Sequence, residues 1–289
     1  MKVLIYGGNG FIGRHLVEHL RRDAEVFSFD RRFVPGTDCI GDIKDAEVVT
    51  AAMLHCDRWV NLAGLLGTSE LIDRAQDAVD VNITGALNVY NAALQQSKPG
   101  LQITVGNHWM NNPYSITKSS AERLALMYNR ELGTDIRVVR AMNVFGPGQK
   151  AQPVRKLMPN VILPALRDEE IVIYGDGSQI MDMIYVKDAA EILARILLGP
   201  KPEAAEILEA GAGPITVNEI VLMVLGIVGK GKVVHLPMRP GEEAKAIVQI
   251  SQKGAARLNQ LIDFNVYRDC TPLYDALVQT VEWYRAHGG

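Results

Sequence analysis

Short apolar runs alternate with amphipathic stretches along the first half of the chain. The apolar runs KVLIY, EVFSFD, RWVNLAG, LQITVG and IRVVRAMNVFG are separated by helical patterns at 11–22, 45–55, 73–96 and 114–132. The apolar runs are too uniformly hydrophobic to have a face exposed to water, which is typical of a parallel sheet covered by helices on both sides. We therefore expect six or seven parallel strands before about residue 146.

The pattern changes after the GPG sequence at 146–148, where proline, glycine and short elements become more frequent. Helical patterns recur at 187–198 and 217–228. We predict an α/β fold: a Rossmann-type doubly wound parallel sheet over 1–146 that binds NAD, and a smaller C-terminal substrate-binding lobe, mainly 147–289. A segment near 180–200 is expected to return to the Rossmann domain. No repeat or long linker interrupts the chain, so the two parts are expected to form one body.

Composition and charge exclude several classes of partner. The chain has 30 basic and 33 acidic residues, spread along its length, so no nucleic-acid partner is expected. Its first apolar run stops at Gly7, far short of the roughly 20 residues of a membrane span, so no membrane partner is expected either. Cys39, Cys56 and Cys270 have no metal-ligand or disulfide spacing and suit a cytoplasmic protein.

A metal site is also not expected. His15 and His19 are four residues apart on the first predicted helix, but no acidic side chain or third ligand lies nearby in the sequence. The two histidines fit a solvated helix face.

Three glycines near the N-terminus indicate a dinucleotide site. Gly7, Gly10 and Gly13 in GGNGFIG follow the first strand and begin a helix. Glycine is required in such a turn because the backbone approaches a pyrophosphate and the helix packs closely on the strand. The helix N-terminus then presents unpaired N–H groups to the phosphates.

The second strand ends in Asp30, 17 residues after Gly13. A carboxylate there accepts hydrogen bonds from the ribose hydroxyls and repels a 2′-phosphate, which favours NAD over NADP. Arg31 and Arg32 follow directly and can receive that phosphate, so NADP remains a less favoured alternative.

Two later loops are candidates for the same cofactor. Asp42, in CIGDIKD, and the Leu62–Ala63–Gly64 turn after the fourth strand stand where loops of such a sheet reach the adenine and the nicotinamide ribose. The pattern fits equally well a helix N-cap at Asp42 and an ordinary tight turn at Gly64.

Tyr114 and Lys118 are the candidate catalytic pair. They are four residues apart at the head of a predicted helix, in PYSITKSSAE, so both side chains lie on one face. A free tyrosine titrates near ~10 and is a poor base at neutral pH. A neighbouring ammonium and a positively charged nicotinamide lower that pKa, so that Tyr114 can remove a hydroxyl proton.

These motifs together resemble the NAD-dependent nucleotide-sugar epimerase/dehydratase family of extended short-chain dehydrogenases/reductases along nearly the whole chain. The matching segments are GGNGFIG, Asp30, GDI, NLAG, VNITGALNV, PYSITK, RAMNVFGPGQ, IYGDGSQ, YVKDAA and RPGE. The resemblance implies that Tyr114 is the acid/base, that Lys118 is its partner and a ribose ligand, and that Asn143 and Arg239 approach the nucleotide diphosphate.

The resemblance also implies further contacts. Phe11, Ile12, Ile43 and Asn82 join the cofactor residues named above. Helices of this family corresponding to 75–96 and 114–132 form a four-helix dimer contact, so a homodimer is expected. An unusually thick core is the alternative explanation of the apolar positions on these two helices.

The sequence departs from the family pattern after the fifth strand. Members of the family usually carry a Ser or Thr there, whereas this chain has Gly106, Asn107 and His108, and Thr104 lies too early, inside the strand. Asn107 or His108 can donate the missing hydrogen bond, or serve structure alone. The loop is also short, with seven residues between Gly106 and Tyr114, which suggests a roomier or differently shaped pocket.

A second departure follows IYGDGSQ, where many relatives have a phosphate-binding arginine and this chain has Ile180 to Met183. Arg239, Lys245 or another cation must then compensate. No carboxylate lies between Thr104 and Tyr114, which disfavours 4,6-dehydration.

We therefore expect an NAD-dependent epimerase that oxidises a nucleotide-activated sugar at C4 to a keto-sugar and returns the hydride to its other face. A nucleotide-sugar dehydratase or keto-sugar reductase of the same fold is the alternative. A non-catalytic dinucleotide-binding sensor is the alternative from another class.

Overall fold

A seven-stranded parallel sheet forms the base of the molecule. The computed structural model describes residues 1–287. The strand order is β3-β2-β1-β4-β5-β6-β10, with every neighbouring pair parallel, and the strands are β1 (Lys2–Tyr6), β2 (Glu25–Asp30), β3 (Cys39–Ile40), β4 (Arg58–Asn61), β5 (Gly100–Val105), β6 (Ile136–Ala141) and β10 (Ile207–Ala210). The order reverses between β1 and β4, which confirms the predicted doubly wound Rossmann sheet.

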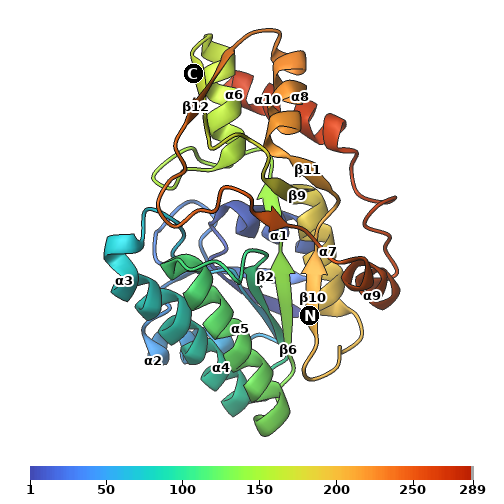
Figure 1. The fold of residues 1–289 in the computed structure, drawn as a ribbon. Coiled ribbons are helices and arrows are strands. Elements are labelled where there is room, and N and C mark those ends of the chain that lie inside the picture. The colour runs from blue at the N-terminus through green and yellow to red at the C-terminus, as the bar shows by residue number, and fades with distance from the viewer. Residues whose placement is uncertain (288–289) are drawn as a thin grey trace.

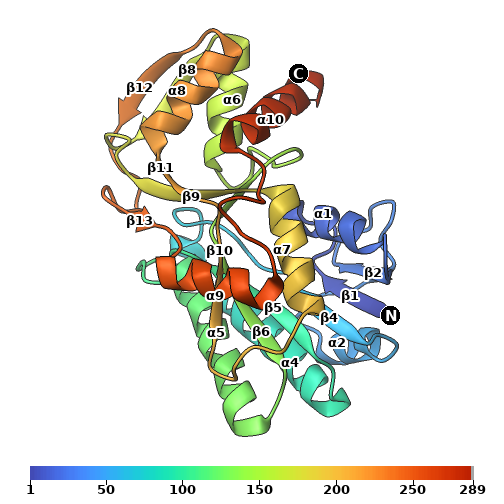
Figure 2. The ribbon, with the colours of Figure 1, turned by 90° about the vertical axis from the view of Figure 1, so that its right-hand side faces the viewer.

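Helices cover both faces of this sheet, as its apolar strands require. One face carries α2 (Ala46–Met53), α4 (Gly85–Gln96) and α5 (Pro113–Leu132), and the other carries α1 (Phe11–Leu20), α7 (Val186–Leu198) and α9 (Gln252–Ile262). The two groups lie on opposite sides of the sheet in Figures 1 and 2. All six residues of β5 are consequently buried.

The strand expected over 136–146 is in fact two strands, so that expectation was wrong. β6 ends at Ala141, and β7 (Asn143–Phe145) pairs instead with β9 (Ile180–Tyr185). Between them the Met142 N–H donates to Ala210 O at 2.9 Å. The chain turns out of the main sheet here because Asn143–Phe145 find their backbone partners in β9. The seventh strand of the main sheet comes from β10, which follows α7.

The single helix expected over 73–96 is also interrupted. This stretch contains η1 (Ile72–Arg74), α3 (Ala75–Val79), a π-helical turn η2 (Asp80–Thr84) and α4. π-turns insert a residue into the helical ladder and are frequently found at functional sites. This one carries Asn82, whose side chain bonds to the β4 loop and to α5, as described below.

The C-terminal lobe has its own apolar core, shown at the top of Figure 1. Its helices are α6 (Leu157–Arg167), α8 (Val217–Val228) and α10 (Leu273–His287). β8 (Glu170–Tyr174) pairs with β12 (Lys232–Leu236), and β9 pairs with β11 (Pro214–Thr216) and β13 (Ile247–Val248). The α8 N-terminus is closed by a capping box between Thr216 and Glu219.

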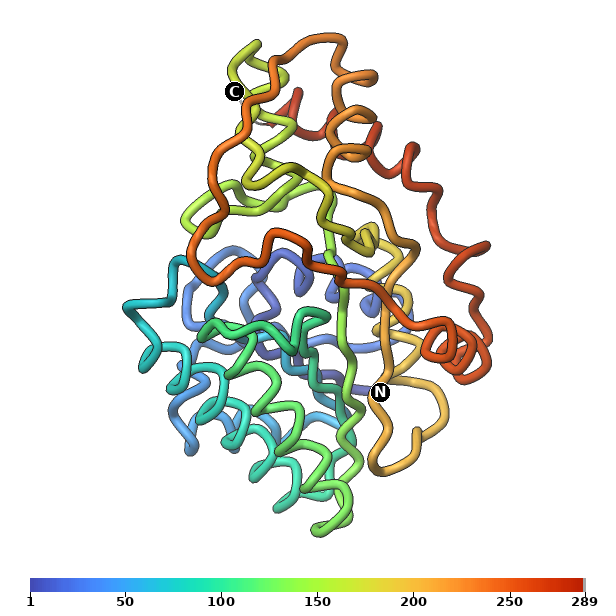
Figure 3. Tube along the Cα trace, in the orientation of Figure 1, coloured from blue at the N-terminus to red at the C-terminus, as the bar shows by residue number. Residues whose placement is uncertain are grey.

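Residues 237–250 cross from the lobe to the loops of the main sheet, as Figure 3 shows for the segment after β12. Asn112 Nδ2 donates to Gly241 O at 3.0 Å, and Ser69 Oγ donates to Pro240 O at 2.6 Å. These contacts join the lobe to the loops after β4 and β5.

None of the helices within residues 1–287 is long and apolar enough to cross a membrane.

Candidate active site

The glycine loop after β1 is packed too closely to accept side chains. A Cβ on Gly7, where φ is +79°, would lie 2.7 Å from Ala63 N, and one on Gly13 would lie 2.7 Å from Gly8 O. Gly10 caps α1 and no side chain caps that end of the helix. The N–H groups of Phe11 and Ile12 therefore stand in the first turn, where a phosphate group accepts from such donors.

Asp30 ends β2 beside this loop, and its Oδ1 accepts from Arg32 N at 3.2 Å. Asn9 joins the loop to the same region, because its Nδ2 donates to Thr37 Oγ1 at 2.7 Å and to Arg32 O at 3.2 Å. Asn9 is a residue that sequence reasoning missed. Its partners lie 23 and 28 residues away, so no local pattern indicated the contact. Arg31 and Arg32 are exposed.

The alternative interpretation of Asp42 as a helix N-cap was wrong. Asp45 caps α2, because its side chain accepts from Glu47 N and Val48 N. Asp42 accepts from Lys44 N at 3.0 Å in the turn before the helix, and Ile43 beside it is buried.

The turn after β4 lies against Asn82 and Lys118. Leu65 N donates to Asn82 Oδ1 at 2.8 Å, and Asn82 Nδ2 donates to Leu65 O and to Thr117 Oγ1, each at 3.0 Å. A Cβ on Gly64 would lie 3.1 Å from Asn82 Oδ1 and 3.7 Å from Lys118 Nζ. The Lys118 ammonium is thereby placed beside Gly64, in the loop that follows β4.

Tyr114 and Lys118 occupy the first two turns of α5, whose N-cap is Asn112. Burial raises the pKa of Tyr114 to about 12 and lowers the pKa of Lys118 to about 8. The lowered pKa that the sequence predicts for Tyr114 is wrong for the protein alone, because desolvation of the phenolate dominates.

Asn107 and His108 lie in the loop between β5 and α5 and contact other residues of that loop. Asn107 Nδ2 contacts Met110 Sδ at 3.5 Å, and His108 Nδ1 lies 3.2 Å from Gly106 O. Thr104 is buried in β5 and donates to Glu122 at 2.9 Å. Ser115, the residue after Tyr114, is fully buried, and its hydroxyl has no hydrogen-bond partner within residues 1–287.

The lobe contributes Asn143 and Asp182 to the junction. Asn143 Nδ2 donates to Asp182 O at 3.3 Å. The Asp182 carboxylate is fully buried and accepts from Ala212 N, Gly213 N and Ile250 N. Burial nevertheless raises the pKa of Asp182, because those three donors do not offset its desolvation. Asp182 thus joins β9 to the segments after β10 and β13.

Arg239 is held by carboxylates in this structure. Its Nη1 lies 3.2 Å from Glu70 Oε1, and its Nε and Nη2 donate to Glu242. Burial works against the charge, but Glu242 and Glu70 raise the pKa of Arg239 overall. Thr68 donates to Glu242 at 3.0 Å, so the network reaches the loop after β4.

The arrangement matches a known family over most of its length. The model of the NAD dependent epimerase/dehydratase family matches residues 3–211. The chain belongs to this family. The glycine loop and Asp30 fit the NAD that the family uses.

Similar proteins of this family act on nucleotide-linked sugars. The dTDP-4-dehydro-6-deoxy-D-allose reductase of Streptomyces bikiniensis is 28% identical over 99% of this chain and 96% of its own length. A trifunctional UDP-glucose 4,6-dehydratase, 3,5-epimerase and reductase of Arabidopsis thaliana is 40% identical over 68% of this chain and 34% of its own. UDP-glucose 4-epimerase of Thermotoga maritima with UDP-glucose has the same fold, with a TM-score of 0.88, 22% identity and 100% coverage of both chains.

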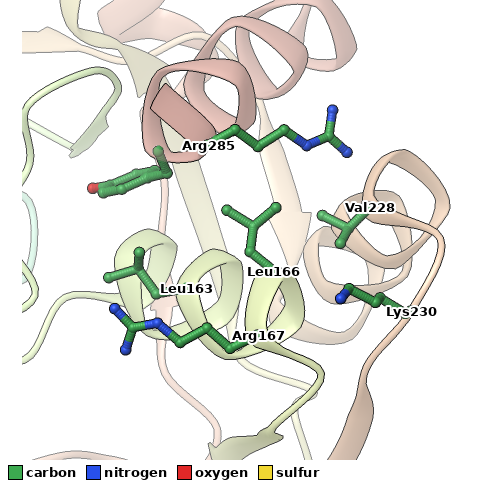
Figure 4. Close-up of a pocket in the computed structure, with 7 residues that line it drawn as sticks. Leu163, Leu166, Arg167, Val228, Lys230 and Arg285 are labelled. Carbon is green, nitrogen blue, oxygen red and sulfur yellow. The ribbon is translucent and has the colours of Figure 1, made fainter. Parts of the chain in front are cut away.

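A cavity of about 400 Å³ lies elsewhere, between α6, α8 and α10 of the lobe. Figure 4 shows Arg167, Lys230 and Arg285 around Leu163, Leu166 and Val228. This cavity contains neither a residue of the glycine loop nor Tyr114 or Lys118, so it is separate from the site of this epimerase/dehydratase family member.

Across residues 1–287, no three His, Cys, Asp or Glu side chains gather as metal ligands would. His15 Nε2 lies 3.0 Å from Pro147 O, and His19 Nε2 lies 3.3 Å from Glu191.

Proposed function

We propose that the protein is an NAD-dependent epimerase that inverts C4 of a nucleotide-activated sugar. One observation carries the proposal. Lys118 Nζ lies beside Gly64 at the carboxyl edge of β4, one helical turn from Tyr114, while the glycine loop opens at the neighbouring edge of β1. A hydroxyl held at Tyr114 and a dinucleotide held at the glycine loop would therefore meet at one place.

The proposed residue roles follow from the chemistry of these groups. Tyr114 Oη takes the proton of the C4 hydroxyl. NAD, which the glycine loop and Asp30 would hold, would supply the acceptor and donor of the C4 hydride. Lys118 stabilises the phenolate through its positive charge and donates to a ribose hydroxyl. Tyr114 gives the proton back after the keto-sugar has turned, so the sugar is inverted with no net redox change. Asn107 and His108 are proposed to position the reacting hydroxyl from the β5–α5 loop.

The proposed cofactor contacts come from five segments. The phosphates meet the helix N-terminus at Gly10 to Gly13, and Asp30 accepts from the adenosine ribose, which selects NAD over NADP. Arg31, Asp42 and Ile43 lie toward the adenine. Leu62 to Gly64, with Asn82, lie toward the nicotinamide ribose.

Asn143 and Arg239 are proposed to bind the substrate diphosphate. The protein is proposed to act as a homodimer through α4 and α5.

A keto-sugar reductase is the second candidate. The Streptomyces bikiniensis relative is named a reductase, and it covers nearly the whole chain. Dehydration is disfavoured because no carboxylate lies between Thr104 and Tyr114 to protonate a leaving hydroxyl.

The test is turnover of UDP-, dTDP-, GDP- and CDP-sugars by the enzyme with NAD, and of their 4-keto derivatives with NADH, followed by mass spectrometry and NMR. Isomerisation at constant mass and constant NADH absorbance, lost in Tyr114→Phe, is expected. Oxidation of NADH with a gain of two hydrogens in the sugar would assign a reductase instead. Tight NAD binding without turnover of any of these sugars would contradict both and favour a dinucleotide sensor.

A further inference from the structure

Two arginines flank one tyrosine at the junction between the lobe and the main sheet. The guanidinium carbons of Arg155 and Arg239 each lie 5.2 Å from the centroid of the Tyr174 ring. The two groups are therefore no farther apart than twice that distance. Both are also tied to Glu70, whose Oε1 accepts from Arg155 N at 3.1 Å and from Arg239 Nη1 at 3.2 Å. Arg155 precedes α6, and Arg239 lies in the segment that crosses between the lobes.

The charges of the two arginines are satisfied differently. Arg239 is paired with Glu70 and Glu242. The Arg155 guanidinium forms no ion pair within residues 1–287, and its one hydrogen bond there goes from Nη2 to Val172 O at 3.4 Å. A partly buried guanidinium with most of its donors unused favours an anion with several oxygens.

The surrounding charges also favour an anion. Three cations, Arg155, Lys156 and Arg239, face two carboxylates, Glu70 and Glu242. Burial lowers the pKa of Lys156, which Glu70 raises and Arg239 lowers by a smaller amount, so both charges act on this ammonium. An added negative group would relieve this imbalance.

Tyr174 also connects this cluster to β9. Gln179 Nε2 donates to Tyr174 O at 2.9 Å, and Met181 follows two residues later in β9. Met181 packs against the apolar core of the lobe, so β9 has no cation at the position where an arginine binds phosphate in many relatives. Arg155, from the segment before α6, lies over the ring of this same Tyr174.

We propose that Arg155 binds the diphosphate of the substrate together with Arg239, in place of the cation that β9 lacks at Met181. The inference rests on the proposed function, because it assumes a nucleoside diphosphate group in the substrate. Charge-assisted hydrogen bonds from a guanidinium contribute enough that losing Arg155 should weaken binding roughly tenfold to a hundredfold.

The experiment measures nucleotide binding directly. Calorimetric titration of the NAD-saturated wild type with UDP, dTDP, GDP and CDP identifies the nucleotide that binds most tightly. That nucleotide and its monophosphate are then titrated into Arg155→Met. We expect the diphosphate to lose roughly tenfold to a hundredfold in affinity, the monophosphate to lose less, and NAD affinity to stay unchanged. Arg130→Met, an exposed arginine near the end of α5, is the matched control and should change none of these.

A rescue separates binding from a structural role. The double variant Arg155→Met/Met181→Arg places a cation back on β9 and should recover most of the diphosphate affinity. If Arg155→Met lost diphosphate affinity only because the hydrogen bond to Val172 O is gone, adding Met181→Arg would not restore that affinity. If Arg155→Met fails to fold, Arg155→Lys tests the same point, with an intermediate loss expected because the planar donors are gone.

The outcomes are distinguishable. If none of the four diphosphates binds the wild type, the proposed function is overturned, and this inference with it. If one binds and the Arg155 variants bind it as tightly as the wild type does, the inference alone is overturned.

Discussion

At the residue scale, the candidate site holds an ionisable group at a cost to stability. Lys118 is only 4% exposed, and burial lowers its pKa from 10.5 to about 8. Within residues 1–287, no carboxylate forms an ion pair with the Lys118 ammonium that would offset this burial. Buried charge of this kind marks functional positions, because packing alone would select an apolar side chain.

Lys118→Met should therefore stabilise the protein without cofactor while abolishing turnover. Below pH 8 the lysine is charged in both states and its burial cost is fully present. Between about 8 and 10.5 the unfolded chain binds more protons, so the wild type gains stability as pH rises. We expect the variant to gain on the order of 3 kcal/mol at pH 7, and the gain to vanish as pH approaches 10.5.

Urea unfolding at pH 7 and at higher pH, compared with Lys253→Met at an exposed position, checks this prediction. A Lys118→Met protein less stable than the wild type at pH 7 would show that the ammonium has a stabilising partner.

Asp30 should decide between the two dinucleotides. Its carboxylate repels a 2′-phosphate, and Arg31 and Arg32 stand ready to accept one. We expect Asp30→Ala to weaken NAD binding and strengthen NADP binding, changing their ratio by roughly tenfold or more. Fluorescence titration with both dinucleotides measures this, and Asp23→Ala, at an exposed turn, is the control. An unchanged ratio would mean that Asp30 does not meet the ribose.

At the element scale, the close contact between α1 and the loop after β1 is possible because residue 13 is a glycine. A Cβ on Gly13 would overlap Gly7 O and lie 2.7 Å from Gly8 O, both backbone atoms that cannot rotate away. The α1 helix can lie this close to β1 only because residue 13 has no side chain. The same closeness brings the helix N-terminus to the edge of the sheet.

Gly13→Ala should therefore move α1 and weaken NAD binding. The overpacking is expected to lower the free energy of unfolding by about 1–3 kcal/mol. Gly226→Ala in α8 is a matched control, because its Cβ would meet nothing within 4 Å. It should stabilise by up to about 1 kcal/mol through helix propensity. Thermal unfolding and NAD titration of both variants check the contrast, and equal effects would contradict it.

At the scale of the whole molecule, the lobe and the Rossmann sheet are joined by segments distant in sequence. The 237–250 segment reaches the loops after β4 and β5, and Asp182 ties β9 to residues beyond β10 and β13. Arg239 and the loops after β4 and β5 therefore belong to one connected body. Movement of the lobe would change the distance between them.

The homodimer is a prediction at this scale. Leu94 on α4 and Leu132 on α5 are exposed apolar side chains on the helices expected to form the contact. We expect light scattering to give twice the 31.7 kDa mass of one chain. The double variant Leu94→Asp/Leu132→Asp should shift the protein toward monomer, whereas Leu222→Asp on α8 should not. A wild-type mass of one chain would contradict the prediction.

The predictable part of this protein is local. Strand and helix order follows from hydrophobic period, and helix α8 begins and ends where the pattern placed it. The glycine spacing, Asp30 at a strand end and the Tyr114–Lys118 spacing are also local, because each depends on a few neighbouring residues. The break after Ala141, the π-turn at Asn82 and the cap at Asp45 instead depend on which backbone and side-chain groups find partners across the fold.

The sequence by itself determined the Rossmann architecture, the family and the candidate catalytic and cofactor residues, because periodicity and short motifs record local geometry. Only the tertiary structure decided that Asn9 holds the loop after β2, that Glu70 and Glu242 pair with Arg239, and that Arg155 faces Tyr174 beside it. Apart from the pair of Arg239 with Glu242, which are three positions apart, these contacts join residues from 19 to 169 positions apart. Such pairings depend on how the elements pack, and no local pattern in the chain encodes them.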